Sequence, residues 1–149
     1  MNIQIKRCGP YAGNLPSYAT TGSAGMDLHA AIEEQLIIPA GGIVMVPTGI
    51  AIALPSGYEC QVRSRSGLAA KSGVFALNAP GTIDSDYRGE IKVILANFSK
   101  QDYIVQSQER IAQIVIAAYT IVEWNPVDEL TETERGTGGF GSTGIKYIG

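Results

Sequence analysis

Short apolar stretches recur along the whole chain, and clusters of proline, glycine and serine separate most of them. These clusters include Pro39-Ala40-Gly41-Gly42, Pro47-Thr48-Gly49 and Pro55-Ser56-Gly57. Many short strands broken by turn residues at this spacing predict an all-β sandwich or barrel, of a distorted jelly-roll type. Because no repeat or linker divides the chain, we expect a single domain over residues 1–149. The predicted strands are Ile3–Arg7, Met26–Ala30, Gln35–Ile38, Ile43–Val46, Ile50–Leu54, Tyr58–Arg63, Val74–Leu77, Ile91–Phe98, Tyr103–Gln106 and Arg110–Tyr119.

One short segment departs from the strand pattern. Ser66–Gly73 combines a capping-type serine, several helix-forming residues and a terminal glycine. It predicts a helix of one or two turns.

Two predicted strands are apolar on both faces. In Arg110–Tyr119, Ile111, Val115 and Ala117 alternate with Ala112, Ile114 and Ile116, and Ile43–Val46 is apolar throughout. A strand at the surface of a sandwich needs only one buried face, so the second apolar face indicates a second buried surface. A subunit interface explains this pattern, and so does two-sided burial inside one domain.

Composition narrows the function classes. The chain has 149 residues, a net charge of −3 and a pI near 5.1, which argues against a general nucleic-acid binder because such proteins need a basic face. Two cysteines and one histidine are too few for a structural zinc site, and we expect reduced thiols in a cytoplasmic protein. The N-terminal stretch does not resemble a signal peptide, and no apolar run reaches the ~20 residues of a membrane span.

The segment Asn78–Glu90 lies between two apolar stretches and predicts a β-hairpin with a long tip. Its tip carries an amide, two carboxylates, an aromatic ring and a guanidinium, which is a rich set of polar groups for a chain reversal. A loop held by two strands is a common way to present a binding or catalytic site. A solvated turn is the simpler alternative.

Three further segments carry candidate chemistry. Arg65 and Ser66 open the predicted helix, where free N–H groups, a guanidinium and a hydroxyl form an anion site; the alternative is a surface arginine beside an N-cap. Asp27 follows a glycine turn at the entry of a strand. Gln113 lies among apolar neighbours, so its amide must bond the backbone or reach a ligand.

The C-terminal segment from Glu129 to Gly144 contains threonine, glutamate, arginine and five glycines, and we expect it to be mobile. Gly139, Gly141 and Gly144 match the spacing G-x-G-x-x-G, but no strand precedes them and too few residues follow for a dinucleotide-binding unit. A P-loop is excluded because Ile145 follows Gly144. A glycine-rich arm with hydroxyls for phosphate oxygens and a ring for stacking remains.

Taken in order, five segments from Ala24 to Gly144 resemble the motifs of the trimeric dUTP pyrophosphatases (dUTPases). One position departs from them: Ser64 stands where the family usually has proline, which leaves the backbone before Arg65 less constrained. The five segments are Ala24-Gly25-Met26-Asp27-Leu28, Ser64-Arg65-Ser66-Gly67-Leu68-Ala69, Gly81-Thr82-Ile83-Asp84-Ser85-Asp86-Tyr87-Arg88-Gly89, Glu109-Arg110-Ile111-Ala112-Gln113 and Arg135-Gly136-Thr137-Gly138-Gly139-Phe140-Gly141-Ser142-Thr143-Gly144.

The resemblance implies hydrolysis of dUTP to dUMP and pyrophosphate, which keeps uracil out of DNA and supplies dUMP for dTMP synthesis. It implies that Asp84 activates the attacking water and that Mg²⁺ bridges the phosphates, with Asp27 helping to hold the ion through water. Gln113 would approach the α-phosphate and the water. Other implied phosphate-binding residues are Arg65, Ser66 and Gly67.

For the nucleoside, the resemblance implies that Asn78 and the backbone of the hairpin read the edge of uracil. The tight turn at Pro80-Gly81 would exclude a thymine methyl group, and Tyr87 would pack on the deoxyribose and clash with a ribose hydroxyl. Asp86 and Arg88 are expected to stabilise the hairpin. Gly81, Thr82, Ile83 and Lys92 complete the expected substrate-binding residues of the hairpin.

The family's architecture implies a homotrimer with shared sites. The hairpin would come from one chain, Arg65, Ser66 and Gln113 from its neighbour, and the arm from the third. Phe140 would stack on the uracil, and the arm would close as a lid. The arm residues expected to bind substrate are Arg135, Phe140, Gly141, Ser142 and Thr143.

Other functions remain open at this point. A dCTP deaminase shares the fold and would release ammonia. A non-catalytic trimer that senses dUTP and regulates a partner is a second alternative, although the intact Asp84 weighs against it. A purely structural jelly-roll protein is a third, and it leaves the glycine-rich arm unexplained.

Overall fold

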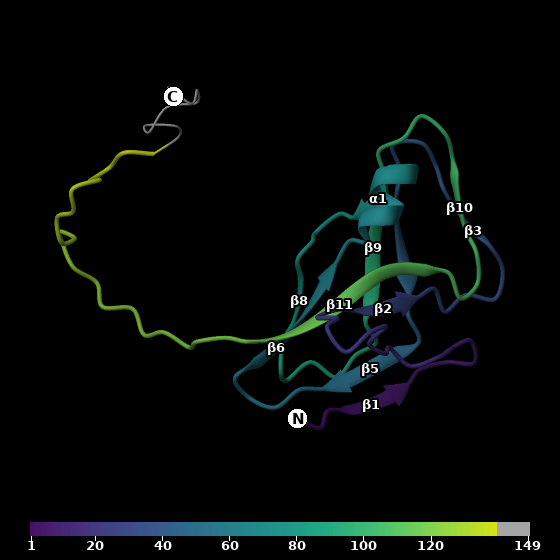
Figure 1. Ribbon diagram of the computed structural model, residues 1–149, viewed down its shortest axis with the longest axis horizontal. Helices are drawn as coiled ribbons and strands as arrows, with labels where there is room; N and C mark the ends of the chain where they lie inside the picture. Colours follow the sequence, from purple (N-terminus) through teal and green to yellow (C-terminus); the bar gives the residue numbers. More distant parts are fainter. Residues whose placement is uncertain (140–149) are drawn as a thin grey trace.

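Residues 1–139 are described from a computed structural model of the chain, in which eleven strands and one helix are arranged as in Figure 1. Each of the ten predicted strands is confirmed, and no end differs by more than one residue. One strand, β8, was not predicted. The elements are β1 (Gln4–Arg7), β2 (Met26–His29), β3 (Leu36–Ile38), β4 (Ile43–Pro47), β5 (Ile50–Ala53), β6 (Tyr58–Arg63), α1 (Ser66–Ser72), β7 (Val74–Ala76), β8 (Gly81–Ile83), β9 (Lys92–Asn97), β10 (Tyr103–Val105) and β11 (Arg110–Ala118).

The strands form two main sheets around one apolar core. One sheet has the order β2-β11-β6-β8 and the other β4-β9-β7, while the pairs β1-β5 and β10-β3 form two smaller ladders. All ladders are antiparallel, as predicted for a sandwich or barrel. Burying one such apolar side chain contributes about 1.5–3 kcal/mol. Core residues from both main sheets include Leu28, Val62, Ile114, Val46, Val93 and Leu95.

A β-bulge in β11 changes the simple alternation that the sequence predicts. The register against β2 shifts between Arg110 and Ala112, and Ile111 and Ala112 are both fully buried. Farther along, Val115 and Ala117 are only half-buried, and Ile43 and Met45 of β4 are more than half exposed. The apolar outer positions are therefore only partly covered within the described part of this chain.

The predicted hairpin is confirmed, because β7 and β9 pair antiparallel. The expected turn at Pro80-Gly81 is wrong in its position: the chain turns over Leu77–Pro80, and Gly81 begins β8, which pairs with β6. Proline and glycine in sequence suggested a turn, whereas Gly81 is buried and a Cβ there would lie 3.4 Å from the Cβ of Val62. Gly81 thus serves close packing of β8 against β6.

The short helix is confirmed, but its capping differs from the expectation. Arg65 occupies the N-cap position with no side-chain capping bond, and Ser66 is the first helical residue. At the other end Gly73 has a φ of 66°, the left-handed conformation that glycine adopts at a helix C-terminus. Within residues 1–139 no helix is long and apolar enough to cross a membrane.

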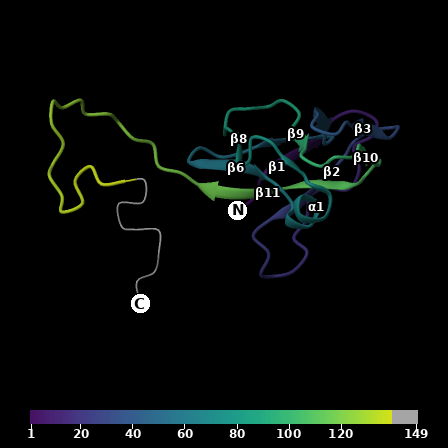
Figure 2. The same cartoon turned by 90° about the horizontal axis from the view of Figure 1, so that it is seen from above.

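After β11, residues 119–139 extend away from the sheets in both views (Figures 1 and 2). This extended segment starts directly after β11, ten residues before the predicted arm at Glu129. It exposes large apolar side chains, including Ile121 at 75%, Trp124 at 89% and Leu130 at 87%. An exposed apolar run of this kind marks an interaction surface.

Gly49 offers a test of the packing around the turn between β4 and β5. Its φ is +69°, and a Cβ would lie 2.7 Å from Cα of Ala12 and 2.9 Å from Cβ of Ala31. Gly41 has a similar φ of +72°, with open space around its Cβ position. We expect Gly41→Ala to cost about 1–2 kcal/mol in unfolding free energy from backbone strain alone, and Gly49→Ala to cost clearly more in urea unfolding. Equal costs for the two variants would contradict the contacts described at Gly49.

Candidate active site

The loop between β8 and β9 is ordered by its own hydrogen bonds. The N–H of Tyr87 donates to the carbonyl of Asp84 at 3.2 Å, and the Tyr87 hydroxyl donates to the carbonyl of Glu90 at 3.0 Å. Arg88 donates from Nη1 to the carbonyls of Ser85 (2.7 Å) and Tyr87 (2.9 Å), which confirms its expected role in stabilising the hairpin. Asp84 therefore lies, exposed to solvent, on a loop whose conformation is fixed by internal hydrogen bonds.

The base of this loop is fixed to the turn between β4 and β5. The buried hydroxyl of Thr48 donates to the carbonyl of Ile91 at 2.6 Å, and the N–H of Gly49 donates to Oε1 of Glu90 at 2.8 Å. Both contacts join residues about forty positions apart in sequence, so no local pattern predicts them. These two contacts hold the base of the loop that carries Asp84, and they were not predicted from the sequence.

A hollow of about 410 Å³ opens beside the loop. Met45 and Ile94, which pair across β4 and β9, contribute an apolar wall. An apolar hollow with a few convergent polar groups is typical of a small-molecule site. It brings together five of the predicted residues: Thr82, Ile83, Asp84, Tyr87 and Lys92.

Asn78 lies in the turn before β8, outside the residues that line this hollow. Its side-chain nitrogen is 3.1 Å from the Cβ position of Gly81, so a larger residue at position 81 would displace the amide. The absence of a side chain at Gly81 thus allows Asn78 and β8 to approach each other closely.

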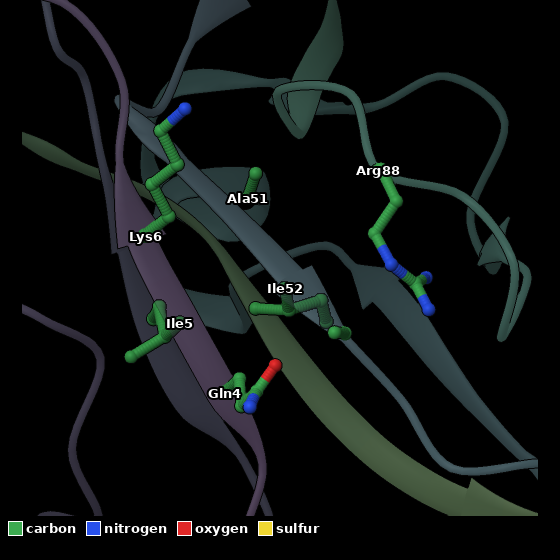
Figure 3. A pocket seen from close by; sticks show the side chains of 7 residues that line it. Gln4, Ile5, Lys6, Ala51, Ile52 and Arg88 are labelled. Atoms are coloured by element: carbon green, nitrogen blue, oxygen red, sulfur yellow. The ribbon is translucent and has the colours of Figure 1, made fainter.

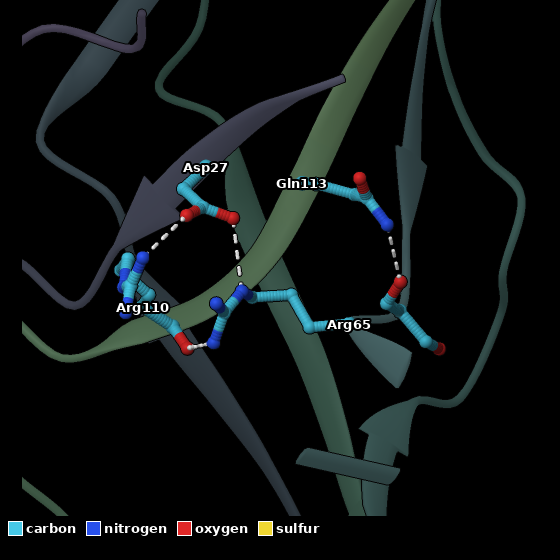
Figure 4. A network of polar contacts seen from close by, with 5 residues as sticks. Asp27, Arg65, Arg110 and Gln113 are labelled. Carbon is cyan, nitrogen blue, oxygen red and sulfur yellow. Dashed lines mark hydrogen bonds and ion pairs between the residues drawn. The ribbon is translucent and has the colours of Figure 1, made fainter. Parts of the chain in front are cut away.

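On the other side of β6, Asp27 links two arginines (Figure 4). Its Oδ1 accepts from Nε of Arg65 at 2.9 Å and its Oδ2 from Nη1 of Arg110 at 3.3 Å. Nη1 of Arg65 also donates to the Arg110 carbonyl at 3.1 Å. The side chains of Asp27 and Arg65 are 30% and 27% exposed, so solvent weakens the pair and its main effect is to orient Arg65.

Gln113 lies beside Asp27 in the ladder between β2 and β11. Its Nε2 donates to the carbonyl of Ser64 at 2.9 Å, so of the two expected options its amide bonds the backbone. Gly25 packs against the other end of the amide, since a Cβ there would lie 2.4 Å from Oε1. The amide is therefore held between the loop before α1 and the start of β2 (Figure 4).

A second hollow, of about 430 Å³, runs along α1 and is lined by three cationic side chains, those of Arg65, Lys71 and Arg110. Tyr103 and Glu109 also line it; burial and the hydrogen bond to Glu109 raise the pKa of Tyr103 to about 12, so this side chain stays neutral. Gly67 lines this hollow and Ser66 does not. We call the hollow beside Asp84 and Tyr87 the hairpin hollow, and the one along α1 the α1 hollow. The two share no lining residue.

The donor set for a metal ion is sparse. Residues 1–139 contain no group of three or more His, Cys, Asp or Glu side chains placed to hold one. Asp27 is the predicted ligand, and each of its oxygens already meets a guanidinium. These residues do not form a protein cage for Mg²⁺, so an ion held here would take most of its ligands from phosphates and water.

The glycine-rich arm, residues 129–149, is described as far as residue 139. Arg135 is described, and its Nε donates to the carbonyl of Gly138 at 2.8 Å, a local contact within the arm. Phe140, Gly141, Ser142 and Thr143 lie outside the described residues.

A third hollow, of about 450 Å³, lies over β1 and β5, with Lys6 and Arg88 on either side of Ala51 and Ile52 (Figure 3). None of the predicted site residues lines it. The candidate site therefore consists of the hairpin hollow and the α1 hollow.

The chain is similar to known proteins in both sequence and fold. The dUTPase family model matches residues 12–144. The deoxyuridine 5'-triphosphate nucleotidohydrolase of Orientia tsutsugamushi (strain Boryong) is 56% identical over 98% of this chain and 100% of its own, and that of Anaplasma marginale (strain St. Maries) is 58% identical over 97% and 99%. A mutant dUTPase of Staphylococcus bacteriophage 80alpha, solved with dUpNHpp, superposes with a TM-score of 0.87 at 25% identity, covering 97% of this chain and 99% of that one.

The fold thus places the chain among the β jelly-roll nucleotidohydrolases. The chain belongs to the dUTPase family, and the resemblance of its motifs is confirmed.

The anchor beneath the hairpin can be tested at Thr48. Thr48→Val keeps the shape of the side chain and removes the donor to Ile91, so we expect a loss of about 1 kcal/mol in unfolding free energy. Thr48→Ser keeps the hydroxyl and should lose less. Urea unfolding of both variants measures this difference, and a Val variant as stable as the Ser variant would show that the hydroxyl does not hold the loop.

Proposed function

We propose that the chain hydrolyses dUTP to dUMP and pyrophosphate, and so keeps uracil out of DNA while supplying dUMP for dTMP synthesis. The observation that carries the proposal is the hairpin hollow. It combines Asp84, Tyr87 and Lys92 with the apolar side chains of Met45 and Ile94, in a chain of the dUTPase family.

Asp84 is the proposed general base. It is exposed on a loop whose backbone is held by Tyr87 and Arg88, and it lines the hollow itself. A carboxylate at such a position can orient a water and accept its proton as the water attacks the α-phosphorus in line.

Tyr87 and the strand β8 are the proposed determinants of nucleoside choice. The Tyr87 ring lies over Gly89, where a Cβ would be 2.3 Å from the hydroxyl oxygen, and its hydroxyl is tied to Glu90. A ring fixed in this way can pack on a deoxyribose and leave no space for a 2′-hydroxyl. The backbone of Gly81, Thr82 and Ile83, with Asn78, would bond the uracil edge, and a wrong base would leave these polar groups unpaired.

Arg65, Ser66, Gly67 and Gln113 are the proposed phosphate-binding residues. Arg65 uses Nε and Nη1 within the protein, and among residues 1–139 its Nη2 has no hydrogen-bond partner. Asp27 thus fixes the plane of the guanidinium while leaving one edge for a phosphate oxygen.

We propose that Mg²⁺ binds together with the phosphates of the substrate. A bound Mg²⁺ would offset the negative charge of the phosphates and would keep most of its waters. A structure of a mutant dUTPase of phage phi11 of S. aureus describes a structural Mg(II) ion in that protein. In this chain Asp27 is the proposed residue that would contact a substrate-bound Mg²⁺ through water.

A homotrimer with shared sites would join the two hollows. They share no residue within one chain, and the segment after β11 exposes apolar side chains that another copy could cover. In this arrangement one chain supplies the hairpin, a second supplies Arg65 and Gln113, and the third supplies its arm from residue 129 onward. Each chain would act as one domain with this arm, and we place the protein in the cytoplasm.

Release of pyrophosphate from dUTP, dCTP, dTTP and UTP, with and without Mg²⁺, tests the function. Among the four nucleotides, we expect rapid release of pyrophosphate only from dUTP. In the absence of Mg²⁺, we expect release from dUTP to be slow. Ammonia release from dCTP would instead indicate a deaminase, and tight dUTP binding without any product would indicate a regulatory protein.

Asp84→Asn should keep dUTP binding and lose turnover by about 10²–10⁴-fold, because the amide cannot accept the proton. Asp86→Asn is the matched control, since Asp86 is exposed on the same loop and does not line the hollow. Steady-state kinetics and dUpNHpp binding measure both properties. Parent-like turnover by Asp84→Asn would remove Asp84 from the mechanism.

Mixing variants tests the shared site. Trimers of Asp84→Asn and trimers of Arg65→Ala should each be nearly inactive, whereas co-refolding equal amounts should restore both groups in about a quarter of the sites. The recovered pyrophosphate release is measured against each variant refolded alone. If each site lies within a single chain, the mixture recovers nothing.

A further inference from the structure

We propose that the hydroxyl of Ser64 is a positioning group, which holds the loop carrying Arg65 against the strand that leads into the hairpin. This inference rests on the proposed function for its substrate. Ser64 stands where the family usually has proline. The resemblance of the motifs implies no role for its hydroxyl.

Ser64 is held from two directions. Its Oγ accepts a hydrogen bond from the N–H of Ala76 at 3.0 Å, and its carbonyl accepts from Nε2 of Gln113 at 2.9 Å. Ala76 is the last residue of β7 and only 2% exposed, so its N–H has no access to bulk water as a substitute partner. One residue therefore connects β7, β11 and the loop after β6.

These contacts fix a part of the chain that has no other cap. Arg65 is extended, with φ −90° and ψ 125°, and no side chain caps α1. The first bond of the helix runs from the N–H of Ala69 to the carbonyl of Arg65. The start of α1 and the direction of the Arg65 side chain therefore depend on the position of Ser64, which its two hydrogen bonds fix.

The same contact connects, within one chain, the loop that carries Arg65 to the strand before the hairpin, two parts that the proposed trimer assigns to different sites. Two residues after Ala76 the chain reaches Asn78 and the turn into β8. A proline at position 64 would restrict its own φ, whereas the Ser64 hydroxyl restrains the loop through a bond to β7. A proline ring would stiffen the backbone at position 64 itself. In this chain, the hydrogen bond from Ala76 in β7 restrains the same loop.

Threonine and valine at position 64 form the matched pair, because they have the same shape and differ in the hydroxyl. Ser64→Val and Ser64→Ala should bind dUpNHpp about fivefold to tenfold more weakly and raise KM for dUTP by a similar factor, in line with the loss of one buried hydrogen bond. Ser64→Thr should stay within about twofold of the parent, as the acceptor is kept.

Binding of dUMP separates positioning from general damage, since dUMP keeps only one of the three phosphates that Arg65 and its neighbours are proposed to bind. We expect dUMP affinity to stay within about twofold in all three variants, with kcat changed less than KM. Equal dUpNHpp affinities for the Thr and Val variants, parent-like binding by Ser64→Ala, or equal losses for dUMP and dUpNHpp would overturn the inference. If the parent protein neither binds dUpNHpp nor hydrolyses dUTP, the proposed function has failed, independently of how the variants compare.

Discussion

The register of β6 decides on which side of the sheet the candidate site is built. β6 pairs with β11 at one edge and with β8 at the other, so that Arg63 lies opposite Gln113 and Gln61 lies opposite Thr82. Val62 and Ile114, on the opposite face, are buried in the core. A slip of one residue would turn Gln113 inward and expose its apolar neighbours. The burial of the core face is therefore what keeps the polar face in place.

On that polar face, modest interactions act by direction more than by strength. The pairs of Asp27 with Arg65 and Arg110 are partly exposed, and such pairs contribute about 0–1 kcal/mol at most protein surfaces. Asp27 nevertheless limits the guanidinium of Arg65 to one plane, and the Ser64 carbonyl does the same for the Gln113 amide. Catalytic geometry needs this kind of restraint, because small displacements of binding groups lower rates strongly.

Much of this could be predicted from the sequence, where local chemistry decides the outcome. Apolar alternation located ten strands, and Gly73 marked the end of α1. β8 was missed because Pro80-Gly81 has the composition of a turn, while the pairing of Gly81 with Val62 decides the conformation. The contacts of Thr48 with Ile91 and of Ser64 with Ala76 join distant strands. No local signal reports such pairs, since they exist only once the sheets have formed.

The two hollows of the candidate site are lined by different residues and differ in character. The groups suited to a nucleoside lie beside β4 and β9, and the cations suited to phosphates lie along α1. In the proposed trimer, surfaces from more than one copy would bring both kinds of group to one triphosphate. The half-buried outer positions of β11, with the exposed Trp124 and Leu130, would provide apolar area for such contacts. In that arrangement each chain's Ser64 lies between the phosphate half of one site and the hairpin of another. Assembly and catalysis would then depend on the same loop, because Arg65 reaches its substrate only through contact between subunits.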